Sequence, residues 1–268
     1  MKVVLFCGGL GLRMREASPL LPKPMVPLGP RPILWHIMKY YSRFGCTDFV
    51  LCLGYRGEVI KEYFLGYNEA LSNDFVLRDG GKQIELLSTD AHDWSITFVN
   101  TGLNATIGER LQRVRPYVGE DDIFLATYGD GLTDAPLHEM VDMLAASDKG
   151  ALFMCVRPKQ QFHLVDVDGG GGVSGIRAAE DADLWLNGGY FAFRQEIFDY
   201  LRPGEDLVDD ALNRMIADSR VIAYRYEGFW GPMDTLKDKQ MLESLLDAGD
   251  PPWSRPRGVE PFGTDPLA

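Results

Sequence analysis

Cysteine and histidine are both scarce in this chain, with four residues of each among 268. The cysteines form no CxxC pair, and Cys7, Cys52 and Cys155 lie within apolar stretches. This placement is typical of reduced cysteines in a core and not of a disulfide framework or a zinc site. The histidines lie far apart without ligand spacing, and no GxSxG sequence occurs, so a histidine metal site and a serine hydrolase have no support.

Long apolar runs are also missing, because no stretch reaches the roughly 20 residues that a membrane-spanning helix needs. The short apolar run at the N-terminus lacks the small-residue cleavage site of a signal peptide. Basic residues are outnumbered, with 27 Lys and Arg against 39 Asp and Glu and a net charge of −12. A nucleic-acid-binding surface is therefore not expected. We predict a cytoplasmic protein with no membrane partner and no nucleic-acid partner.

Positive charge is nevertheless concentrated at the start of the chain. Residues 1–40 contain six Lys or Arg and one acidic residue, a net charge of +5, which leaves −17 for the other 228 residues. A basic segment within an acidic protein indicates a local anionic ligand, and a solvated basic surface is the plainer alternative.

Apolar and amphipathic stretches alternate in the first half of the sequence. Buried strands are predicted over residues 2–9, 48–55 and 122–131, and further strands over 95–100 and 150–157. Helices are predicted over 33–45, 58–64, 109–118 (ending at Pro116) and 136–147. This alternation is typical of α/β proteins with parallel βαβ units in a doubly wound sheet. In such sheets ligands bind at the carboxyl ends of the strands.

The second half of the sequence has a different character. Antiparallel strands are predicted over 162–168, 169–178 and 185–193, a further strand over 221–230 and a closing helix over 236–249. We therefore predict one domain over residues 1–253, with a mixed, mostly parallel sheet and a small antiparallel substrate subdomain. Its two halves divide near residues 135 and 136. Residues 254–268 are rich in Pro and Gly, which predicts a flexible tail.

Two neighbouring motifs near the N-terminus point to phosphate. Gly8, Gly9 and Gly11 follow the first strand and precede Arg13, and the N–H groups of such a turn can hold an anion. Six of the 16 prolines fall within residues 19–32, and two of them, Pro22 and Pro24, flank Lys23 and stiffen the chain around it. A surface linker is the alternative for this proline-rich stretch. Together the two cations would suit a polyphosphate.

Two aspartates are candidates for a magnesium site. Asp130 lies between two glycines at the end of a predicted strand, and Asp234 precedes the last helix. Taken singly, Asp130 could belong to an ordinary turn and Asp234 could be a helix cap. As a pair they suit Mg²⁺, which takes one or two carboxylates and completes its shell with phosphate and water.

A glycine pair inside a predicted strand marks a third feature. Asn187 precedes Gly188 and Gly189, and glycine within a strand often marks the close approach of a ligand. Asn187 could hydrogen-bond a sugar hydroxyl, and a β-bulge is the alternative of equal weight.

In chain order, GGLGLR, PKPMV, ILWHIMKYYSRFG, TYGDG, NGGYF and GFWGPMDTLKDKQMLESL resemble the sugar-1-phosphate nucleotidyltransferases, and among them the cytidylyltransferases. The resemblance covers roughly residues 1–253. It implies a Rossmann-like nucleotidyltransferase fold, with a nucleotide-binding half to about residue 135 and a sugar-phosphate-binding half after it. It also implies a reaction in which CTP and a sugar 1-phosphate, above all glucose 1-phosphate, give a CDP-sugar and pyrophosphate.

The resemblance also implies the roles of individual residues. Nucleotide-binding roles fall to residues of the glycine turn and of the segment entering the 109–118 helix: Gly8, Gly9, Leu10, Gly11, Arg13, Thr101, Ala105 and Arg110. Substrate-binding roles fall to Lys23, Tyr128, Gly129, Asn187, Gly188 and Trp230. The catalytic set is Arg13, Lys23, Asp130 and Asp234, with Asp130 and Asp234 binding Mg²⁺. The implied partners are the two small-molecule substrates and further copies of the chain in a homo-oligomer.

Three departures from the family pattern leave alternatives for both the phosphorylated acceptor and the nucleotide. Leu12 replaces the usual Thr or Ser, and residues 107–109 are Ile-Gly-Glu in place of Thr-Gly-Gly, which would bring Glu109 near a triphosphate. The stretch 176–180 lacks the family's phosphate-gripping Lys, and Arg177 is the candidate substitute. The alternatives are the same chemistry with a cyclitol, a modified sugar or another phosphorylated metabolite, or with GTP or another NTP. A non-catalytic nucleotide-sensing module is the third.

Overall fold

The computed structural model describes residues 1–9, 21–91, 93–158, 163–179 and 182–258. Leu10, Gly11, Leu12 and Arg13 of the predicted nucleotide site lie outside these residues, as does most of the predicted tail. Within them, no helix is both long and apolar enough to cross a bilayer. The four cysteines are buried and free, as predicted.

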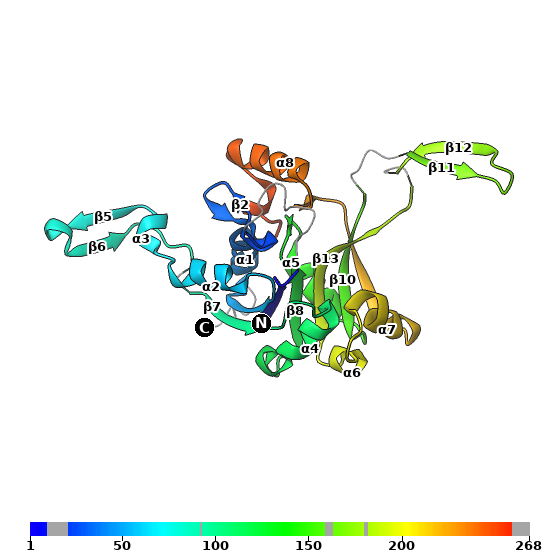
Figure 1. Cartoon of the computed structure of the whole chain (residues 1–268), viewed down its shortest axis with the longest axis horizontal. Helices are drawn as coiled ribbons and strands as arrows, with labels where there is room; N and C mark the ends of the chain where they lie inside the picture. The colour runs from blue at the N-terminus through cyan, green and yellow to red at the C-terminus, as the bar shows by residue number, and fades with distance from the viewer. Residues whose placement is uncertain (10–20, 92, 159–162, 180–181, 259–268) are drawn as a thin grey trace.

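A seven-stranded sheet forms the centre of the molecule, in the order β14-β10-β13-β8-β1-β4-β7 (Figure 1). Only β13 runs antiparallel to its neighbours β8 and β10, which confirms the predicted mixed, mostly parallel α/β sheet. The strands span Lys2–Phe6 (β1), Asp48–Leu53 (β4), Ser95–Asn100 (β7), Ile123–Tyr128 (β8), Ala151–Val156 (β10), Leu186–Arg194 (β13) and Val221–Tyr226 (β14).

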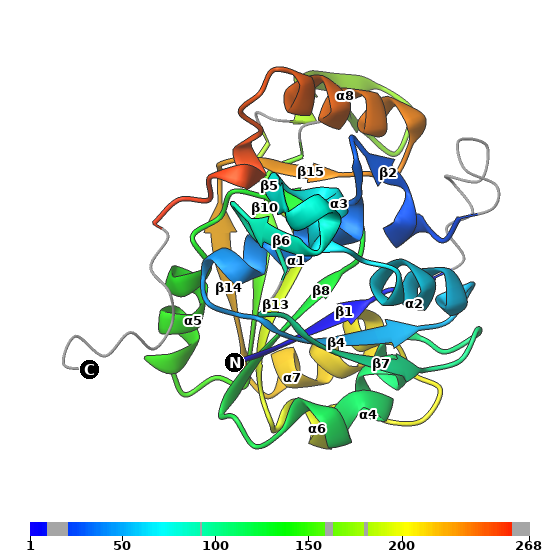
Figure 2. The ribbon, with the colours of Figure 1, turned by 90° about the vertical axis from the view of Figure 1, so that its left-hand side faces the viewer.

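Both faces of this sheet are covered, which explains why its central strands are continuously apolar. One core contains α1 (Ile33–Arg43), α2 (Gly57–Leu65) and α5 (Leu137–Ala145). The other contains α4 (Ile107–Val118), α6 (Ile197–Tyr200), the turn η5 (Leu207–Leu212) and α7 (Asn213–Ala217). Figure 2 shows α4, α6 and α7 below the strands and α8 (Leu236–Asp247) above them.

Six strands of the sheet end at one common edge. The pairings make β1, β4, β7, β8, β10 and β14 run in the same direction, and β13 begins where they finish. This carboxyl edge is where an α/β sheet binds its ligands. Short pairs add to it or lie near it: β9 (Gly131–Thr133) with β15 (Trp230–Pro232), and β2 (Pro27–Leu28) with β3 (Arg31–Pro32).

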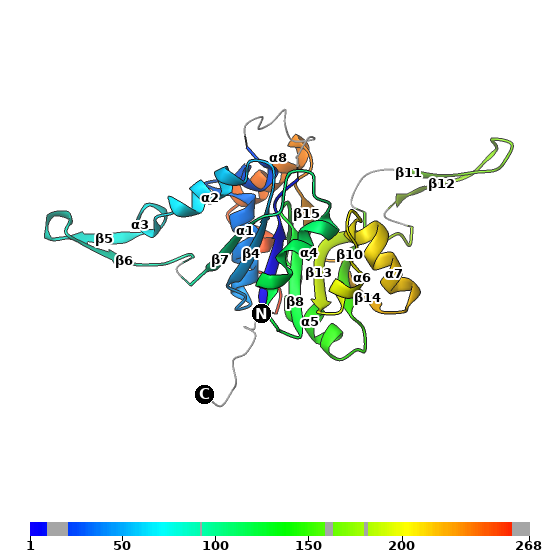
Figure 3. The same cartoon turned by 60° about the horizontal axis from the view of Figure 1, so that its bottom comes forward.

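Two hairpins project from the body on opposite sides (Figures 1 and 3). One consists of β5 (Phe75–Arg78) and β6 (Gln83–Leu86), joined by η3 (Asp79–Gly81) and preceded by α3 (Glu69–Ser72). The other pairs β11 (His163–Val167) with β12 (Val173–Ala178), as predicted for an antiparallel pair. The glycines at 169–172 form its turn, so the second strand starts later than predicted.

Helix α4 differs most from its predicted bounds. It continues through Pro116, although a proline at this position lacks the N–H that would donate to the carbonyl four residues earlier. It also begins earlier, at Ile107, with Thr106 as N-cap in a capping box with Glu109. Glu109 therefore caps the helix, with its carboxylate accepting from the Thr106 N–H at 3.0 Å.

Candidate active site

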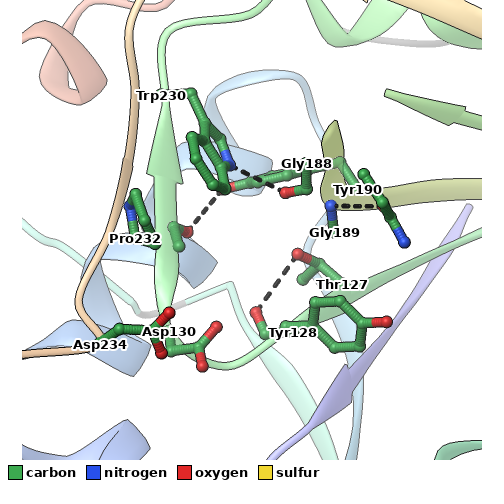
Figure 4. Close-up of a pocket in the computed structure, with 11 residues that line it drawn as sticks. Thr127, Tyr128, Asp130, Gly188, Gly189, Tyr190, Trp230, Pro232 and Asp234 are labelled. Atoms are coloured by element: carbon green, nitrogen blue, oxygen red, sulfur yellow. Dashed lines mark hydrogen bonds between the residues drawn. The ribbon is translucent and has the colours of Figure 1, made fainter. Parts of the chain in front are cut away.

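A pocket of about 240 Å³ opens at the carboxyl edge of the sheet, between β8 and the start of β13 (Figure 4). Its walls come from the end of β8, the turn into β9, the first residues of β13 and the β15 strand. The lining residues are Thr127, Tyr128, Asp130, Gly131, Asn187, Gly188, Gly189, Tyr190, Trp230, Pro232 and Asp234. The fold thus gathers most of the predicted acceptor and metal residues into one place.

Three charged side chains meet at this pocket from distant parts of the chain. The Lys23 Nζ lies 2.7 Å from Asp130 Oδ2 and 2.5 Å from Asp234 Oδ1. The lysine side chain is 12% exposed, and the two carboxylates are about one-third exposed. The ammonium therefore bridges both carboxylates.

Local structure explains how these three side chains converge. Lys23 begins the turn η2 (Lys23–Met25), whose Pro24 and Met25 are buried, so the predicted proline brace does anchor it. Strands β9 and β15 pair Gly131 with Pro232, and the Met233 N–H donates to the Asp130 carbonyl at 2.8 Å. This pairing places the two aspartates side by side, as Figure 4 shows.

Asp234 is not the N-cap of α8, which was the alternative to its role as a metal ligand. The N-cap of α8 is Thr235, whose side chain accepts from the Asp238 N–H. The carboxylate of Asp234 is directed to Lys23 instead.

The donor chemistry of this pair fits Mg²⁺. The described residues contain no group of three or more His, Cys, Asp or Glu that could hold a metal. Two carboxylates already hold a cation, the ammonium of Lys23, between them. A two-carboxylate set suits Mg²⁺ that is held jointly with substrate phosphates and water.

The glycine pair of β13 is both a bulge and a pocket wall. The register with β10 shifts between Phe153, which opposes Phe191, and Cys155, which opposes Asn187, so β13 carries extra residues there. The Asn187 side chain accepts from the Gly189 N–H at 2.9 Å. A Cβ on Gly189, whose φ is +77°, would lie 2.4 Å from the Tyr128 ring. The β-bulge is therefore present, and the contact of Asn187 with a sugar hydroxyl stays a prediction.

Two aromatic residues complete the pocket. The Trp230 Nε1–H donates to the Gly188 carbonyl at 2.9 Å, which fixes the indole over the bulge. Burial, followed by the nearby carboxylates of Asp206 and Asp130, raises the pKa of Tyr128 to about 12, so its hydroxyl stays protonated. Gly129 is tightly packed beside them, since a Cβ there would lie 3.0 Å from Pro24 Cγ and 3.2 Å from the Phe6 carbonyl.

Three of the predicted nucleotide residues, Gly8, Thr101 and Arg110, meet at the ends of β1 and β7. Arg110 is 2% exposed, and its guanidinium donates to Thr101 Oγ1 at 2.7 Å and to the Gly8 carbonyl at 3.0 Å. Further acceptors are the carbonyls of Leu53, Gly102 and Leu103. Burial lowers the pKa of Arg110. Its terminal N–H groups are thus used within the protein, and its predicted contact with nucleotide stays a prediction.

The remaining predicted residues lie as follows. Gly9 is exposed beyond β1, and Ala105 lies partly exposed in the loop before α4. Arg177 does not reach the pocket: it lies on the projecting β12 strand and pairs with Asp166 at 2.5 Å. Sequence reasoning missed Thr127 and Tyr190 as pocket residues. Both could have been found from the sequence, because Thr127 belongs to the TYGDG motif and Tyr190 to the NGGYF motif.

Comparisons with known proteins agree with this geometry. A family model named "Nucleotidyl transferase" matches residues 2–239. Glucose-1-phosphate cytidylyltransferases of Salmonella typhi and Salmonella typhimurium are each 37% identical over 254 residues, which cover 94% of this chain and 98% of theirs. Among solved structures, the UTP-bound UGPase of Acinetobacter baumannii is 22% identical with a TM-score of 0.69, covering 94% of this chain and 95% of that one. HddC of Yersinia pseudotuberculosis is 18% identical with a TM-score of 0.66, covering 91% and 99%. These two structures are similar in fold.

Proposed function

This chain belongs to the nucleotidyl transferase family, and from that premise we propose that it joins CTP to glucose 1-phosphate, releasing pyrophosphate and CDP-glucose. The observation that carries the proposal is the Lys23 ammonium between Asp130 and Asp234 at the carboxyl edge of the sheet. The choice of CTP and of glucose 1-phosphate is supported by the 37% identity to the two Salmonella enzymes.

The reaction needs charge neutralisation more than it needs a base. An oxygen of the sugar phosphate attacks the α-phosphorus of the nucleotide, and the bond to the β-phosphate oxygen breaks with its electron pair leaving on pyrophosphate. The attacking group is a phosphate monoester with a second pKa of about 6, so it is already ionised at neutral pH. Positioning and electrostatic stabilisation therefore supply the catalysis.

Lys23, Asp130 and Asp234 would divide this work. Asp130 and Asp234 would hold Mg²⁺, which when bound neutralises charge on the reacting phosphates. Lys23, anchored by its buried neighbours, would present its ammonium to the same phosphates. Asn187 and Trp230 would form the wall against which the sugar lies. We place this reaction in the cytoplasm, and the homo-oligomer implied by the family stays a prediction.

A different phosphorylated acceptor is the second candidate, and one observation favours it. The family's phosphate-gripping Lys is absent from the 176–180 stretch, and Arg177, its possible substitute, pairs with Asp166 on the projecting hairpin. Among the described residues, the acceptor phosphate would then depend on Lys23 and on the metal held by Asp130 and Asp234. That arrangement tolerates acceptors other than glucose 1-phosphate.

A pyrophosphate-release assay with Mg²⁺ tests both candidates. CTP, GTP, UTP, ATP and dTTP are each combined with a panel of sugar and cyclitol 1-phosphates, with Asp234→Asn as the inactive control. Among acceptors whose only charged group is the 1-phosphate, we expect the highest kcat/KM with CTP and glucose 1-phosphate. A different best pair would replace the substrate assignment and leave the chemistry intact. Silence across the panel, together with nucleotide binding by calorimetry, would support a nucleotide-sensing module instead.

A further inference from the structure

A second cavity, of about 490 Å³, lies at the end of the sheet opposite β7. It is lined by Arg157, Trp185, Arg225, Tyr226, Glu227, Gly228 and Arg257. The register opposes Val156 of β10 to Leu186 of β13 and to Tyr226 of β14, so their neighbours Arg157, Trp185 and Glu227 lie side by side across three strands. The cavity is thus built at the same carboxyl edge as the pocket of Figure 4.

Positive charge predominates in this cavity although the whole chain is acidic. Three arginines and one glutamate line it, a formal charge of +2 in a protein of net charge −12. The Cζ atoms of Arg157 and Arg225 lie 4.6 Å and 5.2 Å from the ring centroid of Trp185. Contact between a guanidinium and an indole face is attractive and holds both groups in place. The tryptophan therefore organises two arginines in one small volume.

The nearby carboxylates pair with two of the three arginines. Arg257 lies 3.2 Å from the buried carboxylate of Asp134, so its charge is compensated within the protein. Arg157 lies 3.3 Å from Glu227 and 3.8 Å from Asp183, whose side chains are 70% and 79% exposed. Exposed pairs of this kind contribute little energy and exchange readily for another anion. In the part of the chain that the structure describes, Arg225 has no carboxylate partner. Its guanidinium is therefore available to a ligand.

The cavity lies farther along the same edge of the sheet than the acceptor pocket. Strands β8, β13, β10 and β14 are consecutive neighbours in the sheet. At about 4.8 Å between strands, the arginines lie roughly 10 to 14 Å along the edge from the end of β8. An acceptor whose reacting phosphate lies at Lys23 and whose ring lies over the bulge of β13 would point its far end toward them. A neutral hexose would offer the arginines hydroxyl oxygens but no negative charge.

We propose that Arg157, Arg225 and Trp185 form an anion-binding subsite for a second negatively charged group, a phosphate or carboxylate, at the far end of the acceptor. The inference rests on the proposed function, because it extends the acceptor pocket of that reaction. Arginine suits this role since its planar fork binds both phosphate and carboxylate in bidentate geometry. A separate small anion offers the same chemistry, and the experiment separates the two sources.

The test compares acceptors that differ in their far end. Pyrophosphate release with CTP is measured for glucose 1-phosphate, glucose 1,6-bisphosphate and glucuronic acid 1-phosphate. We expect a KM about tenfold lower for at least one doubly charged acceptor, the gain expected from one charge-assisted hydrogen bond. Arg225→Gln should remove this advantage and leave the KM values for glucose 1-phosphate and CTP unchanged. Arg78→Gln, an exposed arginine of the β5–β6 hairpin, is the matched control.

Each other outcome has a defined meaning. Equal KM values for all three acceptors, or an advantage that survives in both Arg225→Gln and Arg157→Gln, overturns the inference. Stimulation of glucose 1-phosphate turnover by inorganic phosphate, lost in Arg225→Gln, also overturns it by identifying a separate anion as the ligand. If no acceptor is turned over, the proposed function fails. Calorimetry with glucose 1,6-bisphosphate then decides the subsite: binding lost in Arg225→Gln supports it, and equal or undetectable binding overturns it.

Discussion

The two ends of the carboxyl edge of the sheet hold their charged groups in opposite ways. At the end formed by β1, β4 and β7, Arg110 is buried and donates to carbonyl and hydroxyl oxygens. At the end formed by β8, β13, β10 and β14, Lys23 and Arg157 lie partly exposed in ion pairs and border open cavities.

The buried contacts at the first end maintain the fold, whereas the exposed ion pairs at the second end leave charged groups accessible to a substrate. A buried guanidinium that gives its N–H groups to carbonyls fixes three strand ends relative to one another, because breaking any contact would leave a buried polar group unpaired. Partly exposed ion pairs can instead exchange partners with a substrate at small cost. The first end is therefore expected to tolerate little change, and the second can change its ligand without loss of the fold.

Asp234→Asn should have the largest effect on activity. It removes one of the two carboxylates that would hold Mg²⁺ and keeps the side-chain volume, so kcat should fall at least about 1000-fold. Pyrophosphate release measures this, with Asp250→Asn, an exposed aspartate paired with Arg255, as control. A kcat near that of the wild type would exclude the metal role of Asp234.

Lys23→Met should separate catalysis from metal binding. Loss of the ammonium should lower kcat by at least about 100-fold. In the absence of nucleotide, however, Mn²⁺ should bind more tightly to the variant, because the ammonium no longer competes for Asp130 and Asp234. Electron paramagnetic resonance titration with Mn²⁺ measures this affinity.

A second paired lysine, Lys2, provides the control for the predicted fall in kcat and the predicted rise in Mn²⁺ affinity. Lys2 pairs with Asp48 at 2.8 Å near the other end of the strands, so Lys2→Met should change neither kcat nor Mn²⁺ affinity. A Lys23→Met protein that loses both activity and Mn²⁺ binding would contradict the competition between lysine and metal.

Gly8→Ala should affect stability at the rigid end of the edge. The new Cβ would lie 2.0 Å from Arg110 Nη1, so the guanidinium must move and give up contacts to Thr101 and to the strand-end carbonyls. The free energy of unfolding should fall by about 1 to 3 kcal/mol, measured by urea denaturation. Gly9→Ala, whose Cβ would meet nothing within 4 Å among the described residues, should leave it unchanged. Equal stabilities would show that Arg110 does not hold the strand ends.

The sequence was informative where a side chain is fixed by the chain on either side of it. Lys23 between prolines and Asp130 at a strand end could be predicted, because a rigid flank and the direction of a strand determine where each side chain lies. The capping role of Glu109 was missed, because a capping box with Thr106 was not considered, and its placement near a triphosphate stays a prediction.

Contacts that depend on distant packing could not be predicted. The partners of Arg110 come from β1, β4 and β7, and only the register of these strands brings their carbonyls together. The cavity around Trp185 requires the register of β10 with both β13 and β14. Gly8 and Leu53 are distant in sequence from Arg110, as Arg157 and Arg225 are from Trp185, and no local pattern records these contacts.

Arg177→Gln should have the smallest effect and sharpens the comparison most directly. Sequence reasoning made this arginine the substitute for the missing phosphate-gripping Lys, yet it lies on β12 and pairs with Asp166 there. Because both side chains are about half exposed, loss of the pair should leave kcat and the KM for glucose 1-phosphate within about twofold of the wild type. Steady-state kinetics alongside Arg225→Gln measures this. A tenfold rise in KM for Arg177→Gln would mean that the β11–β12 hairpin reaches the acceptor during turnover, and that the acceptor end of the edge includes a segment that the sheet itself does not position.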